Sequence, residues 1–113
     1  MLYGIKNCDT VRKARKWLEA NQQTIDFCDY RDSPLAQSTL QSWIDTLGWQ
    51  ALLNQRSTSF RGLSNEDKQD IDAAKALRLM LAQPTLIKRP VLVTPQGVLV
   101  GFSDASYQEW FAK

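Results

Sequence analysis

The chain has 113 residues with 14 basic and 12 acidic side chains, so its net charge at neutral pH is only +2. A charge this small argues against the strongly basic face of a nucleic-acid-binding protein. No apolar run approaches the ~20 residues that span a bilayer, and the first residues lack the pattern of a signal peptide. We therefore expect one domain over residues 1–113, with no nucleic-acid or membrane partner, in the cytoplasm, where thiols stay reduced.

The absence of histidine limits the possible chemistry. It excludes Ser-His-Asp and Cys-His catalysis, and most zinc sites, because Cys8 and Cys28 also lack CxxC spacing. We expect no metal site and no tightly bound cofactor. A nucleophile in this chain must be activated by a helix terminus, by cations or by hydrogen bonds.

The first third of the chain predicts a strand, a helix and a second strand. Residues 2–6 form a short apolar run, and residues 10–20 carry an apolar stripe at helical spacing. Apolar and polar side chains then alternate over 24–30, which is typical of a strand. A strand–helix–strand unit of this length predicts two parallel strands.

The middle of the chain is predicted to be helical. Leu40, Trp43, Ile44 and Leu47 follow helical spacing. The first predicted helix begins at Ser33-Pro34 and ends at Gly48, and further helical turns follow over 49–53. Residues 54–63 are predicted to form a polar loop. After it, a helix capped by Ser64 breaks near 70–72, and another helix over 73–81 ends before Pro84.

The last third returns to strands. Two apolar runs, 91–94 and 97–100, flank Pro95-Gln96 and predict a β-hairpin. A final helix opens at Ser103 or Asp104, with its inward face formed by Ala105, Trp110 and Phe111. The whole order fits an α/β, thioredoxin-like fold with a mixed four-stranded sheet and a helical insertion over about residues 34–83.

Cys8 is the main candidate for chemistry, because it lies between the first strand and the first helix. Free N–H groups and the dipole at a helix N-terminus favour a thiolate. The neighbouring Asp9 and Thr10 are expected to cap the helix. The alternative is an inert, buried cysteine.

Two sets of cations accompany Cys8. Lys6 or Arg12 is expected to stabilise the thiolate, while the other basic residues of the helix form a solvated face. Arg89-Pro90 precedes the hairpin, and a cis-proline in a thioredoxin-like fold faces the reactive cysteine. Arg89 would then lie beside the sulfur. The alternative is an ordinary proline at the start of an edge strand.

Three segments resemble the arsenate reductase-related ArsC/Spx/YffB family, and above all its YffB-type branch. They are Tyr3-Gly4-Ile5-Lys6-Asn7-Cys8-Asp9-Thr10, Asn54-Gln55-Arg56-Ser57-Thr58-Ser59-Phe60 and Leu86-Ile87-Lys88-Arg89-Pro90-Val91-Leu92-Val93. The resemblance implies that Cys8 is the nucleophile, that Arg89 and Arg56 bind anionic groups, and that glutathione is the thiol partner. Asn7, Thr10, Arg12 and Pro90 would support the site.

The chain departs from the family pattern in three places. Arsenate reductases of this family use three arginines, and here Phe102 takes the place of the third. Asn54 falls where the arginine of the insert would be, with Arg56 two residues on. Spx regulators bind the RNA polymerase alpha subunit and many carry a CxxC switch, but Val11 replaces its second cysteine. Arsenate would be under-coordinated, and the switch is absent.

The leading hypothesis is a glutathione-dependent thiol oxidoreductase that uses Cys8 through a mixed disulfide. Cys28 is expected to be structural, with a resolving role as the alternative. A transcription regulator of the Spx kind, with RNA polymerase alpha as its protein partner, and an arsenate reductase are the competing hypotheses.

Overall fold

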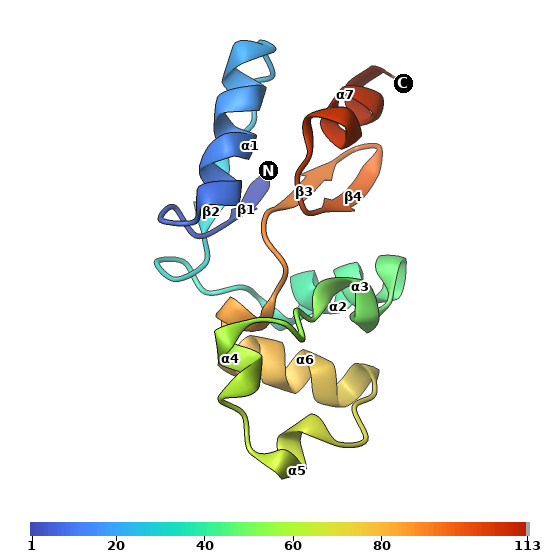
Figure 1. The fold of residues 1–113 in the computed structure, drawn as a ribbon. Coiled ribbons are helices and arrows are strands. Elements are labelled where there is room, and N and C mark those ends of the chain that lie inside the picture. Colours follow the sequence, from blue (N-terminus) through green and yellow to red (C-terminus); the bar gives the residue numbers. More distant parts are fainter. Residues whose placement is uncertain (113) are drawn as a thin grey trace. The chain divides into compact units, whose positions relative to one another are not determined.

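A computed structural model describes residues 1–112 and divides the chain into two units. The first unit combines residues 1–33 with the chain from residue 89 onward, and the second is the intervening segment, 34–88 (Figure 1). The candidate nucleophile Cys8 and the Arg89-Pro90 pair therefore belong to the same unit. In the described part of the chain, no helix has both the length and the apolar character needed to cross a bilayer.

The first unit contains the sheet. Its elements are β1 (Leu2–Gly4), α1 (Asp9–Ala20), β2 (Phe27–Asp29), β3 (Val91–Thr94), β4 (Gly97–Val100) and α7 (Asp104–Ala112). The strand order is β2-β1-β3-β4; β1 and β2 run parallel, and the other two pairings are antiparallel. The predicted mixed four-stranded sheet is confirmed, although β1 and β2 are shorter than the sequence pattern suggested.

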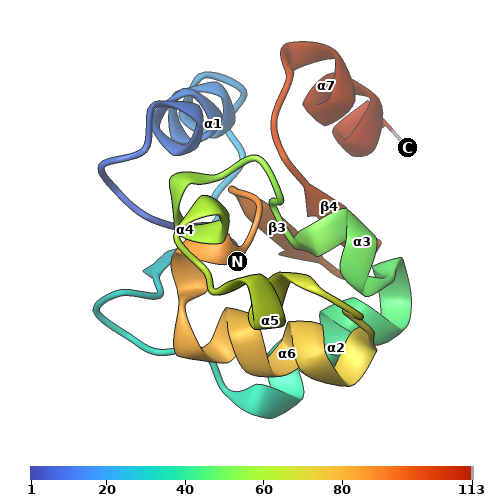
Figure 2. The same ribbon diagram turned by 60° about the horizontal axis from the view of Figure 1, so that its bottom comes forward.

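One face of this sheet packs against α1 and α7. Leu2 and Leu92 are cross-strand partners, and both pack with Leu18 of α1 and Tyr107 of α7 in one buried cluster. Trp17 extends the contact, with its ring centroid 5.5 Å from that of Tyr107. The two helices accordingly lie side by side in both ribbon views (Figures 1 and 2).

The inward face of α7 differs from the prediction. Tyr107 is fully buried, while Ala105 is exposed, and Trp110 and Phe111 are partly buried against the cluster. Residues two apart on a helix point roughly 200° apart, so Ala105 and Tyr107 cannot share a face. The bulkier apolar surface of Tyr107 faces the core because its burial stabilises the fold more.

The second unit is helical. It contains α2 (Gln37–Leu47), α3 (Trp49–Leu52), α4 (Thr58–Arg61), α5 (Asn65–Lys68), α6 (Ala73–Ala82) and the 3₁₀ turn η1 (Pro84–Leu86). Helix α2 lies beside α6 (Figure 2), and both bury their apolar stripes. An antiparallel bridge between Leu53 and Ile87 brings the segment before α4 to the end of the unit.

Two predictions for this unit were wrong. The segment 54–63 is not wholly a loop, because it contains α4, whose N-cap Ser57 accepts a hydrogen bond from the Phe60 N–H through Oγ. Helix α2 begins at Gln37 rather than at Pro34, after an N-cap residue, Ala36, with extended backbone. Both differences concern short stretches, where the side-chain pattern specifies a helix boundary poorly.

Candidate active site

The site lies at one edge of the sheet of the first unit. Strands β1 and β2 are parallel, so Gly4 and Asp29, which are register partners, end at the same edge. Strand β3 is antiparallel to β1, with Tyr3 opposite Val91, so β3 begins at that edge. The loop that carries Cys8 and the residue pair before β3 are therefore brought together by the strand order alone.

Cys8 is itself the N-cap residue of α1, with extended backbone at φ −91° and ψ 129°. Its carbonyl accepts the first helical bond from the Arg12 N–H at 2.9 Å, and its own N–H donates to the Ile5 carbonyl at 3.1 Å. The prediction that Asp9 and Thr10 cap the helix was wrong, since both lie inside its first turn. The sulfur takes the position that a capping oxygen usually occupies.

Partial burial and four further interactions determine the acidity of the Cys8 thiol. Partial burial raises its pKa, but this is outweighed by the N–H of Val11, a hydrogen bond from Arg89, the N–H of Thr10 and the charge of Arg89. The pKa therefore lies below its ordinary value. Because the thiolate is the nucleophilic form, the environment favours reaction at neutral pH.

Arg89 and Pro90 stand opposite Cys8 at this edge. The peptide bond between them is cis, as the sequence analysis suggested. Pro90 is buried, and its carbonyl accepts a hydrogen bond from the Gly101 N–H at 2.8 Å. Arg89 is half-buried, and its guanidinium reaches the sulfur. It can therefore both stabilise a thiolate and bind an anionic group next to it.

The side chains of Lys6 and Arg12 pair with carboxylates rather than with the Cys8 sulfur. The Lys6 ammonium forms an ion pair with Asp32 at 3.1 Å. The Arg12 guanidinium pairs with Asp9 at 2.5 Å and also donates to the Asn7 carbonyl at 3.4 Å. The expectation that one of these cations stabilises the thiolate is wrong for this structure, because Arg89 is the cation that lowers the Cys8 pKa.

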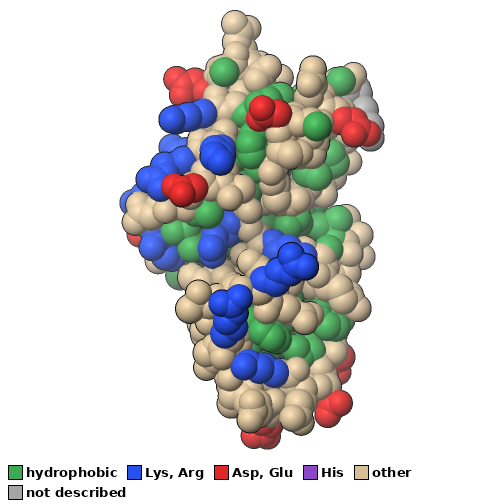
Figure 3. Space-filling model, viewed as in Figure 1, with side chains coloured by type: hydrophobic (Ala, Val, Ile, Leu, Met, Phe, Trp, Pro, Cys, Tyr) green, Lys and Arg blue, Asp and Glu red, His purple; other side chains and the backbone are tan. Residues whose placement is uncertain are grey.

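The remaining basic side chains of α1 form a solvated face. Lys and Arg side chains gather over this helix in the space-filling view (Figure 3). Lys13 and Lys16 are exposed, and the Arg15 guanidinium lies over the Phe27 ring at 4.4 Å from its centroid. These residues give the helix a positive surface but no direct role at the sulfur.

Arg56 belongs to the second unit, in the turn that precedes α4. Its N–H donates to Oδ1 of Asn54 at 3.1 Å, and the residue is exposed. Asn54 thus has a structural task, since its side chain closes the turn and its own N–H donates to the Leu86 carbonyl at 2.7 Å. The role of Arg56 at the site stays a prediction from the family resemblance.

Two residues of the edge were missed by the sequence analysis. Asp29 is buried, and its carboxylate accepts hydrogen bonds from the N–H of Lys6 at 3.0 Å and of Arg31 at 2.9 Å. It thereby ties the loop before Cys8 to the end of β2. Tyr30, the next residue, is only 1% exposed. The alternating pattern over 24–30 indicated a strand there, but not which side chains its end would bury.

Cys28 occupies a different environment from Cys8. It pairs with Tyr3 in the parallel register of β1 and β2, within the sheet rather than beyond its edge. Burial and the charge of Asp29 raise the pKa of its thiol. Both thiols are free, and their pKa values are shifted in opposite directions, so Cys8 is the more reactive thiol.

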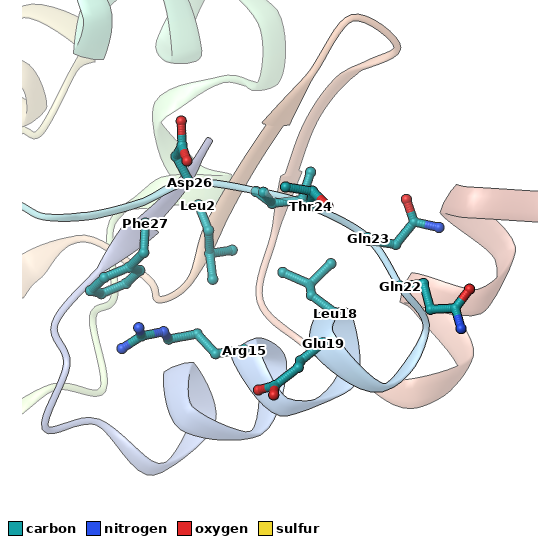
Figure 4. A pocket seen from close by; sticks show the side chains of 10 residues that line it. Leu2, Arg15, Leu18, Glu19, Gln22, Gln23, Thr24, Asp26 and Phe27 are labelled. Atoms are coloured by element: carbon teal, nitrogen blue, oxygen red, sulfur yellow. The ribbon is translucent and has the colours of Figure 1, made fainter.

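A hollow also lies beside the second half of α1 and the segment leading into β2 (Figure 4). Its lining includes Arg15, Glu19 and Asp26 but no cysteine, so it provides no thiol. Among residues 1–112, no three His, Cys, Asp or Glu side chains are grouped closely enough to hold a metal ion. Cys8 and Arg89 are thus the residues best suited to nucleophilic chemistry.

Comparison with known proteins identifies the family to which the chain belongs. The sequence profile of the ArsC family matches residues 3–110. The chain belongs to the ArsC family. An uncharacterized protein of Haemophilus influenzae is 41% identical over 111 residues, which cover 98% of this chain and 97% of that protein. The global transcriptional regulator Spx of Streptococcus pneumoniae is 28% identical, over 91% of this chain and 78% of its own length.

Solved structures of ArsC-family relatives share the fold. A YffB protein is 46% identical and superposes with a TM-score of 0.90, covering 96% of this chain and 95% of its own. An arsenate reductase (ArsC) related protein from Brucella melitensis is 45% identical with a TM-score of 0.78, covering 99% and 93%. The ArsC-family fold is thus the thioredoxin-like α/β fold that the element order predicted.

Proposed function

We propose that this ArsC-family protein is a thiol oxidoreductase of the cytoplasm that uses Cys8 alone and glutathione as its thiol partner. The observation that supports this most directly is the Cys8 sulfur at the N-terminus of α1, where backbone N–H groups and Arg89 lower the thiol pKa. The pKa of the Cys28 thiol is raised instead, and Cys28 lies within the sheet. One thiol is therefore prepared for nucleophilic attack.

The reaction proceeds through two exchanges. The Cys8 thiolate attacks a sulfur of a glutathione-containing disulfide, the S–S bond breaks, and the second thiolate leaves as Cys8 becomes disulfide-bonded to glutathione. A second glutathione thiolate attacks the glutathione sulfur of this mixed disulfide, which releases oxidised glutathione and regenerates the Cys8 thiolate. The Arg89 guanidinium suits a glutathione carboxylate, and Arg56 is the second candidate for such a contact.

Incubation with oxidised glutathione, followed by intact-mass measurement, tests the proposal. We expect one glutathione adduct in the native chain and in Cys28→Ser, and none in Cys8→Ser. Added reduced glutathione should remove the adduct. The proposal fails if no adduct forms or if Cys8 titrates like an ordinary exposed thiol.

A second candidate function is transcription regulation, which the similarity to Spx favours. Binding of the purified RNA polymerase alpha subunit to the immobilised chain tests it. Saturable binding that Cys8→Ser retains would support a regulator, because such an interaction does not need the thiol. Val11 at the third position after Cys8 gives no support to a CxxC switch.

Arsenate reduction is disfavoured by the position of Phe102. Its ring is partly buried and packs against Tyr107 of the hydrophobic core, with centroids 4.7 Å apart. An aromatic ring at this position cannot replace the guanidinium that the family resemblance implies there. We expect no arsenate reduction above background with glutathione as the reductant.

A further inference from the structure

Tyr30 is a buried polar residue at the same sheet edge as Cys8 and Arg89. It directly follows β2, and its N–H donates to the Gly4 carbonyl at the end of β1 at 3.2 Å. The residue is 1% exposed, and its hydroxyl has no regular hydrogen bond to any of residues 1–112. A buried hydroxyl without a hydrogen bond of regular geometry is costly, which calls for an explanation.

The surroundings of this hydroxyl supply one. Burial raises the pKa of Tyr30 to about 12; the charge of the Arg89 guanidinium and a hydrogen bond from it oppose this rise, and the charges of Cys8 and Asp29 add to it. The hydroxyl thus lies within electrostatic reach of both site groups and stays protonated throughout the physiological range. Arg89 in turn acts on Cys8 directly. The guanidinium, with five N–H donors, can contact the phenol oxygen and the sulfur together.

We propose that Tyr30 is a positioning residue, whose buried hydroxyl contacts the Arg89 guanidinium and keeps it beside the Cys8 sulfur. This inference rests on the proposed function only in that Cys8 is its nucleophile. The backbone bond to Gly4 and the burial of the ring hold Tyr30 in place. A rigid neighbour limits the rotamers of the long arginine side chain, so the charge stays near the thiolate.

The chain contains a matched control. Tyr107 is also fully buried, and its hydroxyl also has no hydrogen bond to the described residues. Its pKa is raised by burial alone, without an effect from Arg89 or Cys8. Tyr107→Phe therefore removes an equivalent hydroxyl from the core of the same unit and leaves the site untouched.

The test measures the rate of alkylation by iodoacetamide against pH, in a Cys28→Ser background so that only Cys8 reacts. Tyr30→Phe should move the midpoint to higher pH and slow the reaction at pH 7 by about three- to tenfold, since one pKa unit changes the thiolate fraction about tenfold. The limiting rate at high pH should change less than twofold. Tyr107→Phe should reproduce the parent profile.

A double variant tests whether Tyr30 acts through Arg89. In an Arg89→Ala background, Tyr30→Phe should cause no further shift of the midpoint. The proposal is overturned if the Tyr30→Phe profile superimposes on that of the parent, if Tyr107→Phe shifts it equally, or if the shift persists without Arg89. Alkylation requires no glutathione, so a failure here is distinct from a failure to form the glutathione adduct.

Discussion

The backbone of β1 at Gly4 lies directly against the side chain of Val11 in the first turn of α1. A methyl group on the Cα of Gly4 would lie 2.8 Å from Cγ2 of Val11, which is fully buried. This approach is possible only without a side chain at position 4. Because Cys8 lies in the loop that joins these two elements, the contact also contributes to the position of its sulfur.

Gly4→Ala should therefore destabilise the fold. The added methyl group overpacks the contact with Val11, which typically costs about 1–3 kcal/mol. Denaturant unfolding should show a lower midpoint with an unchanged slope. Gly62→Ala is the control, because a methyl group there would meet only backbone oxygens at the ordinary distance of 3.6 Å. Equal stability of Gly4→Ala and the native chain would contradict the argument.

Asp29 should make the stability depend on acid pH. Burial raises the pKa of its carboxyl, but N–H groups of Lys6 and Arg31 and the Arg31 guanidinium outweigh this and lower it below 3.8. The folded state binds the proton more weakly than the unfolded state. The stabilisation is therefore complete well above pH 3.8 and is lost as the pH falls through the lowered folded-state pKa.

Asp29→Asn should reduce the unfolding free energy at pH 7 by about 1 kcal/mol, since a charged acceptor is lost. The difference from the native chain should shrink as the pH falls below 3.8 and through the lowered folded-state pKa, where the native carboxylate becomes protonated. Asp32→Asn is the matched control, because the Asp32 side chain is 64% exposed and pairs with the exposed Lys6 ammonium. A difference for Asp29→Asn that is constant with pH would rule out this role.

Long periodic segments of the fold could be predicted from the sequence, and short ones could not. The apolar stripes of α1, α2 and α6 and the two runs of the hairpin identify their elements directly. Helix α4 is one turn long, so it shows no period, and its cap Ser57 is one of several polar residues in that stretch. The buried face of α7 could not be predicted, because it depends on which bulky side chain packs against the sheet.

The site could be predicted as far as local sequence determines it. The position of Cys8 at a helix start follows from the elements on either side. The pairing of Arg12 with Asp9 is a local contact between residues three apart, which the helical spacing allowed. The pairing of Lys6 with Asp32 and the burial of Tyr30 depend on how β2 lies beside β1. The pattern of one strand contains no such information.

Arg89→Ala should raise the pKa of the Cys8 thiol, because both its hydrogen bond and its charge lower that pKa in the native chain. A shift of about one unit would reduce the thiolate fraction at pH 7 about tenfold. The absorbance of the thiolate, followed against pH in a Cys28→Ser background, measures it. Lys88→Ala removes an exposed charge from the preceding residue and should leave the midpoint nearly unchanged. Equal shifts in both variants would contradict a specific contact.

Replacement of Cys28 should spare the chemistry of Cys8. Thiolate formation increases with pH, and burial together with the Asp29 charge raises the pKa of Cys28, so this thiol should react mainly in alkaline solution. At pH 7, Cys28→Ala should keep the native alkylation rate, whereas Cys8→Ala should lose about tenfold or more of it. Peptide mapping of the alkylated chain identifies the site. A Cys28→Ala chain that forms the glutathione adduct but cannot release it to added glutathione would instead assign Cys28 a resolving role.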